Sequence, residues 1–390
     1  MGDTRLKVLS VFGTRPEAIK MAPVVRELER RSDEINPLVC ITGQHREMLD
    51  QVLQLFQIVP SYDLNVMEDN QSPTQVASAI LGQLEPILRD ERPDWVLVQG
   101  DTMTCTAASL AAFYAKLKVG HVEAGLRTYD KWQPFPEEVN RRITGIIADL
   151  HFAPTERARA NLLREDVPDK SIFVTGNTVI DALRWITDEQ PPTNAINVGN
   201  LDLQRMIGDT NDVRMILVTA HRRENFGRPL ENICLALQNI AAEYGELVRI
   251  IYPVHRSPNV WGPVHRMLGG IANIVLTPPL DYLSMVYLLK RSYLVLTDSG
   301  GLQEEAPALG VPVLVLREST ERPEAVEAGT ARLVGTDPDR IFSEAVALLE
   351  NHSEYQQMAQ ATNPYGDGHA AKRIVSELIG ETYYPDIGVV

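Results

Sequence analysis

The sequence predicts an α/β protein with two domains, each built around a parallel β-sheet. Three observations support this prediction. The chain has 390 residues, which is more than one ordinary hydrophobic core holds. Short apolar runs alternate with helix-like stretches along its whole length, as in strand–helix–strand units. The runs form two successive series, and the least regular stretch, residues 188–212, is rich in Pro, Asn and Gly.

Each series contains predicted strands separated by predicted helices. The first series has strands at 7–13, 37–42, 95–100, 120–123, 150–153 and 172–176. The second has strands at 215–220, 249–254, 274–277, 293–298, 312–317 and 332–334. Two helices have clear start signals, because Ser72-Pro73 precedes 74–88 and Pro229 precedes 230–244. A last helix is predicted over 369–379, after the turn at 363–366.

The predicted domain boundary follows Gly176, where a strand ends and Asn177-Thr178 can cap a helix. The first domain is therefore predicted over 1–176, and the second over 177–368.

Composition restricts the class of protein. The formal charge of −15 disfavours binding to nucleic acid, while local pairs of basic residues suit a small anionic ligand. No apolar run approaches the roughly 18 residues that span a bilayer, and no signal-peptide pattern opens the chain. Cys40, Cys105 and Cys234 are isolated within apolar segments. They are predicted to be buried thiols in a reducing cytoplasm, with neither a disulfide nor a zinc site.

Three carboxylates, Asp101, Glu123 and Glu137, lie at or just after the ends of predicted strands. The carboxyl ends of parallel strands meet at one edge of a sheet, so these side chains can converge. Carboxylates that share a cleft shift each other's pKa values apart, which can supply both an acid and a base near neutral pH. This pattern predicts an acid/base enzyme.

The first strand–helix turn carries Arg15 and has one glycine, Gly13, so it is neither a dinucleotide fingerprint nor a P-loop. Arg15 is equally explained as an anion ligand at a helix start or as a surface residue of the turn. Tyr114 and Lys118 have the spacing used by nicotinamide-dependent epimerases. Without the glycine fingerprint we interpret that spacing as a chance match and predict no NAD and no metal.

The second domain has two candidate phosphate-binding segments. Ser299-Gly300-Gly301 precedes a helix and exposes backbone N–H groups, and Glu305 on that helix suits a ribose diol. His221 follows a strand and is flanked by two arginines, an arrangement suited to a leaving phosphate. Taken singly, a glycine pair can merely close a turn, and a histidine can be structural.

Taken together, eight segments in order closely resemble the non-hydrolysing UDP-N-acetylglucosamine 2-epimerases of bacteria. They are FGTRPEAIKMAP, TGQHREMLDQVL, QGDTMT, HVEAGLRT, PFPEEVNRR, VTGNTVIDAL, VTAHRRENFGRPLENI and TDSGGLQEEAPALGVPVLVLRESTERPEAVEAGT. The resemblance implies two Rossmann-like domains of glycosyltransferase-B architecture, with the active site in the interdomain cleft. It also implies that the C-terminal segment 369–390 packs back on the first domain, and that the protein is a homodimer.

The resemblance also implies roles for individual residues. The implied catalytic residues are Asp101, Glu123, Glu137 and His221. The implied substrate contacts are Arg15, Lys20, Ser299, Gly300, Gly301, Glu305 and Arg322. Gln44 and His45 match an allosteric loop, although Glu47 stands where regulated members carry Gln. Leu280 and Met285 stand where Gln and Phe can flank the uracil pocket.

The implied reaction is reversible epimerisation at carbon 2 of UDP-N-acetylglucosamine, through loss of UDP to 2-acetamidoglucal and its re-addition. UDP-N-acetylglucosamine and UDP are then the ligands, and surface polysaccharide synthesis is the use. Three alternatives stay open: a UDP-sugar glycosyltransferase of the same fold, a hydrolysing epimerase that releases N-acetylmannosamine and UDP, and a nucleotide-sugar sensor. The glycosyltransferase would not need the three carboxylates, and the sensor would still respond after they were substituted.

Overall fold

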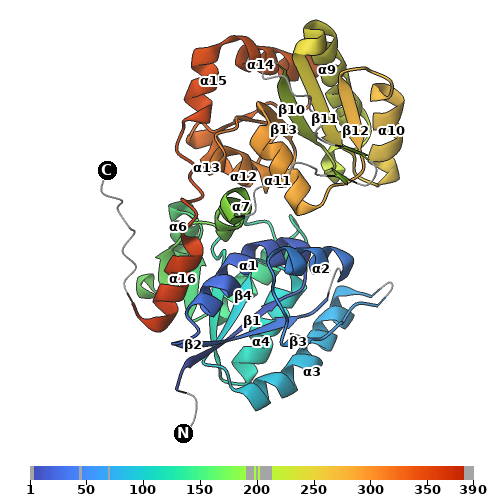
Figure 1. Cartoon of the computed structure of the whole chain (residues 1–390). Helices are drawn as coiled ribbons and strands as arrows, with labels where there is room; N and C mark the ends of the chain where they lie inside the picture. Colours follow the sequence, from blue (N-terminus) through green and yellow to red (C-terminus); the bar gives the residue numbers. More distant parts are fainter. Residues whose placement is uncertain are drawn as a thin grey trace. The chain divides into compact units, whose positions relative to one another are not determined.

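The computed structural model describes residues 4–43, 46–68, 71–189, 197–198, 201–202 and 213–381. The chain forms two compact units (Figure 1). One unit contains Met1–Trp185 and Tyr365–Val390, and the other contains Ile186–Pro364. Each is an α/β unit with its own parallel sheet, as predicted.

The sheet of the first unit has seven strands in the order β3-β2-β1-β4-β5-β6-β7, and all pairs are parallel. Its strands are β1 Leu6–Phe12, β2 Ile35–Ile41, β3 Tyr62–Asp63, β4 Trp95–Gln99, β5 Lys118–Val122, β6 Leu150–Ala153 and β7 Ile172–Val174. Its helices are α1 Arg15–Arg30, α2 Arg46–Leu55, α3 Pro73–Glu91, α4 Met103–Tyr114, α5 Glu137–Ile147, α6 Glu156–Arg164 and α16 Ala370–Ile379, with the 3-10 turn η1 Asp169–Ser171. Strand order reverses between β1 and β4, which is where ligands of such sheets bind.

The second unit repeats this plan with six parallel strands in the order β12-β11-β10-β13-β14-β15. Its strands are β10 Arg214–Thr219, β11 Val248–Pro253, β12 Ile274–Thr277, β13 Leu294–Thr297, β14 Val313–Val315 and β15 Ala331–Leu333. Its helices are α9 Arg228–Tyr244, α10 Pro258–Leu268, α11 Tyr282–Arg291, α12 Leu302–Ala308, α13 Pro323–Glu327, α14 Pro338–Glu350 and α15 His352–Ala359, with the turns η2 Arg223–Asn225 and η3 Gly245–Leu247. The short strands β8 Asn197–Val198 and β9 Leu201–Asp202 pair antiparallel. In the six-stranded sheet, strand order reverses between β10 and β13.

Successive side chains of a β-strand point to opposite faces of the sheet, so residues two apart on one strand pack against the same covering helices. Leu9 and Val11, two residues apart on β1, pack with Val96 and Val98 of β4. Helices α3 and α4 contribute side chains to the same cluster, so they cover that face of the sheet. The predicted helix start at Ser72 is confirmed: its side chain accepts a hydrogen bond from Gln75 N, and Gln75 reciprocates in a capping box.

The boundary between the two units lies within helix α7 (Thr178–Glu189), directly after Trp185. The sequence had predicted it after Gly176. The physical reason is that the helix packs on the first unit as far as Trp185. Trp185 stacks on Phe56 with ring centroids 4.7 Å apart. Asp181 accepts hydrogen bonds from the backbone of Ala370 at 3.2 Å and Ala371 at 2.8 Å. These bonds hold the start of α16 on the first unit, whose residues at this end begin at Tyr365.

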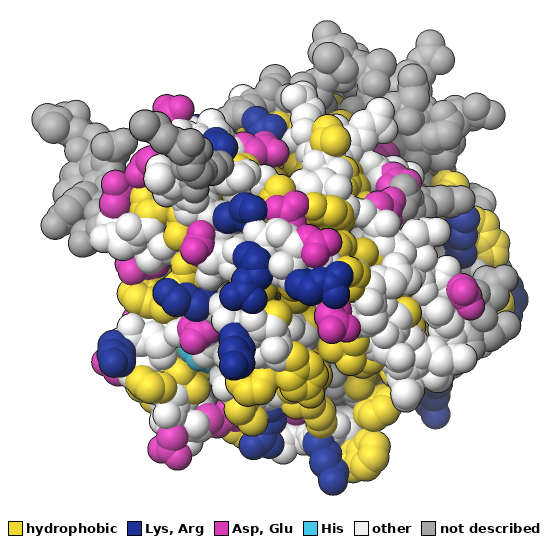
Figure 2. Space-filling model, turned by 90° about the horizontal axis from the view of Figure 1, so that it is seen from below, with side chains coloured by type: hydrophobic (Ala, Val, Ile, Leu, Met, Phe, Trp, Pro, Cys, Tyr) yellow, Lys and Arg dark blue, Asp and Glu magenta, His cyan; other side chains and the backbone are white. Residues whose placement is uncertain are grey.

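The three cysteines are buried, as predicted from the sequence. Cys40, Cys105 and Cys234 are buried free thiols, and burial raises the pKa of Cys40 and of Cys234 to about 12. On the face shown in Figure 2, Lys and Arg side chains stand among Asp and Glu side chains. Within the part of the chain that is described, no helix is long and apolar enough to cross a membrane.

Candidate active site

Glu123 follows β5 and is held by side chains from three other segments of the first unit. Lys20 Nζ on α1 lies 2.5 Å from its Oε1, and Asn177 Nδ2 donates to the same oxygen at 3.0 Å. Gln99 at the end of β4 donates to Oε2. Glu123 has a φ of 62°, a left-handed conformation that costs energy in a non-glycine residue. The carboxylate is therefore fixed in place, and the structure brings the predicted residues Glu123 and Lys20 together.

Asp101 lies at the end of the neighbouring strand β4 and is held by helix α5. Its Oδ2 accepts a hydrogen bond from Arg141, whose side chain also lies 3.3 Å from Glu138 Oε2. Asn140 Nδ2 donates to the Asp101 carbonyl oxygen at 2.9 Å. Arg141 and Asn140 thus fix both the side chain and the backbone of Asp101. Neither was in the predicted site.

Glu137 is the first residue of α5, where the helix dipole favours a negative charge. Its Oε2 is shielded from solvent and accepts no hydrogen bond from the described residues. The next residue, Glu138, is fully buried and accepts bonds from the backbone N–H groups of Thr128 at 3.0 Å and Tyr129 at 3.1 Å. The two adjacent carboxylates therefore differ: Glu138 holds the preceding loop, and Glu137 has an oxygen available for another partner.

The turn that carries Arg15 is tied to the turn after β4 by a buried carboxylate, Glu17. Its side chain accepts hydrogen bonds from Gly13 N at 3.0 Å, Thr14 N at 2.7 Å and Thr102 Oγ1 at 2.5 Å. Burial raises the pKa of Glu17 above its usual value, although these hydrogen bonds act to lower it. Arg15 is half-buried on the first turn of α1. Gln44 and His45, predicted for an allosteric loop, lie outside the described residues.

In the second unit, His221 follows β10 and lies beside Asp298, which follows β13. His221 Nδ1 is 3.5 Å from Asp298 Oδ1, and the His221 ring stacks on His255 with centroids 5.6 Å apart. Burial lowers the pKa of His221, the charges of Arg222 and His255 add to this effect, and Asp298 opposes it. The imidazole is therefore neutral near pH 7 before any anion binds.

The predicted phosphate-binding residues of the second unit lie in one cluster. A Cβ built on Gly300 would lie 3.1 Å from Glu321 Oε1 and 3.5 Å from Arg322 Cζ, so a side chain there would meet both. Arg322 Nε donates to Glu304 Oε1 at 2.7 Å, which joins it to α12. A Cβ on Gly301 would lie 3.3 Å from Glu305 Oε1. Ser299-Gly300-Gly301, Glu305 and Arg322 are thus side by side.

Glu321, absent from the predicted site, is contacted by three arginines, one of which is Arg222 at 3.5 Å. Arg317 contacts it at 2.5 Å and Arg322 at 3.6 Å. Burial alone would raise the pKa of Glu321, but the charges of Arg322 and Arg317 outweigh burial and lower it to about 2. An ionised carboxylate keeps both guanidinium groups in place.

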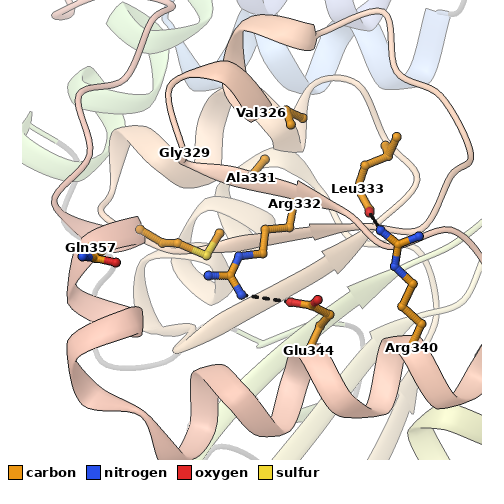
Figure 3. A pocket seen from close by; sticks show the side chains of 9 residues that line it. Val326, Gly329, Ala331, Arg332, Leu333, Arg340, Glu344 and Gln357 are labelled. Carbon is orange, nitrogen blue, oxygen red and sulfur yellow. Dashed lines mark hydrogen bonds and ion pairs between the residues drawn. The ribbon is translucent and has the colours of Figure 1, made fainter.

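A separate surface pocket of about 590 Å³ lies in the second unit at β15, α14 and α15 (Figure 3). Its arginines are engaged: Arg332 contacts Glu344 at 2.9 Å and Glu354 at 2.6 Å, and Arg340 donates to the Leu333 carbonyl oxygen. None of the predicted site residues lines it. Across the described ranges, no group of three or more His, Cys, Asp or Glu side chains is arranged for a metal ion.

Tyr114 and Lys118 do not lie on one helix. Tyr114 ends α4, whereas Lys118 begins β5 and its Nζ lies over the Trp95 ring, 5.2 Å from the centroid. The spacing therefore does not place the two side chains on a common helix face, in agreement with its interpretation as a chance match.

Comparisons with known proteins match nearly the whole chain. A family model described as UDP-N-acetylglucosamine 2-epimerase matches residues 26–379. The UDP-N-acetylglucosamine 2-epimerase of Salmonella typhimurium is 57% identical over 373 residues, which are 96% of this chain and 98% of that protein. A crystal structure of UDP-GlcNAc 2-epimerase from Neisseria meningitidis, bound to UDP-GlcNAc, superimposes with a TM-score of 0.87 at 48% identity, covering 96% of this chain and 100% of that one.

The fold itself is shared more widely. The glycotransferase of kitacinnamycin superimposes with a TM-score of 0.65 at 13% identity, covering 97% of this chain and 99% of that one. At this identity the likeness concerns architecture alone, so the fold does not separate an epimerase from a glycosyltransferase. The identity above 50% and the family match do separate them. The chain belongs to the UDP-N-acetylglucosamine 2-epimerase family.

Proposed function

We propose that this protein interconverts UDP-N-acetylglucosamine and UDP-N-acetylmannosamine by reversible epimerisation at carbon 2, without net hydrolysis. The observation that carries the proposal is the pair of carboxylates at the ends of adjacent strands, Asp101 after β4 and Glu123 after β5, each held by its own set of partners. Proton removal from one face of a carbon and delivery to the other requires two such groups. A glycosyltransferase of the same fold has no need of them.

The chemistry follows from the substrate. Carbon 2 bears an N-acetyl group and no neighbouring carbonyl, so its proton is not acidic enough for enolisation. When the bond from carbon 1 to the UDP oxygen breaks, carbon 1 gains positive charge and the carbon 2 proton becomes acidic. Loss of that proton gives 2-acetamidoglucal and UDP. Protonation of carbon 2 on the opposite face and return of the UDP oxygen to carbon 1 give the epimer, with no net oxidation or reduction.

The first unit supplies the proton transfers in this proposal. Asp101, Glu123 and Glu137 provide the base and the acid. Lys20 orients Glu123 by its contact at 2.5 Å. Because the reaction has no redox step, it requires no nicotinamide.

The second unit stabilises the departing diphosphate in this proposal. Arg322 and the backbone N–H groups of Ser299-Gly300-Gly301 bind its negative charge, with His221 as a further donor. Glu305 binds the ribose diol.

We further propose that the protein acts in the cytoplasm as a homodimer and supplies N-acetylmannosamine for surface polysaccharides.

Isosteric substitutions test these assignments. Asp101→Asn, Glu123→Gln and Glu137→Gln each remove a charge without changing side-chain volume. We expect kcat to fall by about 10²–10⁴-fold where the residue transfers a proton, while the Kd for UDP changes little. Glu156→Gln is the matched control, because Glu156 is exposed on α6. Near-normal turnover by Asp101→Asn and Glu123→Gln together would refute the assignment.

A further inference from the structure

The buried carboxylate of Asp298 has two oxygens in different surroundings. Oδ2 accepts hydrogen bonds from the backbone N–H groups of His221 and Arg222, each at 2.8 Å, and from Asn225 Nδ2 at 3.0 Å. Oδ1 is equally shielded from solvent, yet no described residue donates a hydrogen bond to it. A buried carboxylate oxygen without a hydrogen-bond donor costs free energy of folding. The role of Oδ1 therefore depends on the nearest side chain that can donate to it.

That neighbour is the imidazole of His221, whose Nδ1 lies 3.5 Å from Oδ1. The two residues are held at this separation by strand pairing, because Thr219 and Thr297, which end β10 and β13, are register partners. Their hydroxyls are also 2.6 Å apart. The 3.5 Å between Nδ1 and Oδ1 is at the outer limit of a hydrogen bond, and hydrogen bonds of catalytic groups are often long before substrate binds.

We propose that Asp298 is a positioning residue for His221, holding its proton on Nδ1 so that Nε2 is directed to the substrate diphosphate. The inference rests on the proposed function for the identity of that diphosphate, and it adds a residue that the sequence did not point to. A carboxylate can only accept from Nδ1–H, so it selects one of the two neutral tautomers. Nε2 then lacks a proton and is free to take one up.

Proton uptake at Nε2 gives the donor that a departing diphosphate needs. Burial and the charges of Arg222 and His255 disfavour the imidazolium, and Asp298 is the group that opposes them. When the diphosphate adds its own negative charge, Asp298 stabilises the imidazolium from one edge of the ring while Nε2–H donates to the phosphate from the other. The proton is taken from solvent when the substrate binds and returns there on release.

Asp298→Asn separates this role from a merely structural one. The carboxamide oxygen in place of Oδ2 retains the three hydrogen bonds that hold the turn. The NH₂ group then takes the place of Oδ1 and donates to Nδ1, which forces the proton to Nε2. Asn225→Ala is the matched control, because it removes one donor to Oδ2 and leaves Oδ1 and His221 unchanged.

The experiment is long-range ¹H–¹⁵N NMR of the full-length protein labelled on its histidine rings, at pH 8 without substrate. His221→Gln assigns the His221 signals. We expect the Nδ1–H tautomer in the unsubstituted protein and in Asn225→Ala, and the Nε2–H tautomer in Asp298→Asn. We also expect kcat of Asp298→Asn to fall by about 10²–10³-fold, the loss typical of a removed transition-state donor, with an unchanged melting temperature.

Three results would overturn the inference: an Nε2–H tautomer in the unsubstituted protein, an unchanged tautomer in Asp298→Asn, or a switched tautomer with unchanged kcat. The tautomer is measured without turnover. A protein that lacks epimerase activity would therefore refute the proposed function while the NMR result still decides the position of the proton.

Discussion

Lys20 Nζ lies 2.5 Å from Glu123 Oε1 and joins helix α1 to the loop after β5. Both side chains are largely buried, so salt screens the pair little. Asn177 and Gln99 donate to the same carboxylate, which leaves it little freedom to turn. A carboxylate fixed in this way can approach a sugar carbon from one defined face, as proton transfer with inversion requires.

Breaking this pair is predicted to destabilise the fold. Lys20→Met leaves a mostly buried carboxylate without its cation and should lower the free energy of unfolding by about 2–4 kcal/mol. In the double variant with Glu123→Gln the loss should be smaller than the sum of the single losses by more than about 1 kcal/mol. Urea denaturation measures all four proteins. Additive losses would show that the two side chains do not stabilise each other.

Arg141 is predicted to act on Asp101, whereas its neighbour in sequence is not. Arg141 contacts Asp101 and Glu138, while Arg142 is half-exposed and lies 3.7 Å from Glu165. Arg141→Gln should lower kcat by about 10–100-fold with little change in the Kd for UDP, because Asp101 loses its orientation. Arg142→Gln is the control and should turn over normally. Equal effects from the two variants would contradict a specific role for Arg141.

Replacing glycine by alanine is predicted to destabilise the protein at Gly125 and to stabilise it at Gly82. Gly125, just after Glu123, has a φ of +89°, and a Cβ there would lie 2.3 Å from the Ala158 carbonyl oxygen of α6. Gly125→Ala should therefore cost more than about 2 kcal/mol. Gly82 lies in α3 with nothing near its Cβ, so Gly82→Ala should stabilise by about 0.5–1 kcal/mol. Thermal unfolding of both variants gives the comparison, and equal melting temperatures would contradict it.

Two buried histidines should make the first unit sensitive to acid. His121 and His151 are register partners on β5 and β6, and burial lowers the pKa of His121 to about 3 and of His151 to about 4. In the unfolded chain they bind protons near pH 6.5, so stability is full above that pH and falls as pH drops towards 4. The slope contributed is at most about 1.4 kcal/mol per pH unit for each histidine.

Urea midpoints measured between pH 7.5 and 4.5 test this window. His151→Asn should flatten the dependence because one of the two neutral histidines is removed. His352→Asn is the matched control, since His352 is exposed at the start of α15. A dependence that is the same in both variants would show that other groups cause the loss.

The fold could be predicted closely where strands are long and apolar. All twelve predicted strands are present, with ends shifted by a few residues. The strands that were missed are β3, β8 and β9, each two residues long, because so short a segment carries no alternation to detect. The boundary between the units lies after Trp185 rather than after Gly176, because Asp181 and Trp185 still pack on the first unit.

Position after a strand pointed to Asp101 and Glu123, whereas Lys20 and Arg322 were implied only by the family resemblance. In the structure Lys20 contacts Glu123, and Arg322 lies beside Gly300. The supporting residues could not be found in the same way. Asn177 and Asp298 meet their partners only through tertiary contacts between segments 54 and 77 residues apart. Spacing along one sequence carries no signal for such pairs.

The central claim is epimerisation through exchange of the carbon 2 proton, and proton NMR in heavy water tests it most directly. Purified protein is incubated with UDP-N-acetylglucosamine and no added nicotinamide. The predicted result is UDP-N-acetylmannosamine with deuterium at carbon 2, and deuterium entering the remaining UDP-N-acetylglucosamine as the reaction reverses. An epimer that retains its original proton, free sugar with UDP as the only products, or an unchanged substrate would contradict the claim.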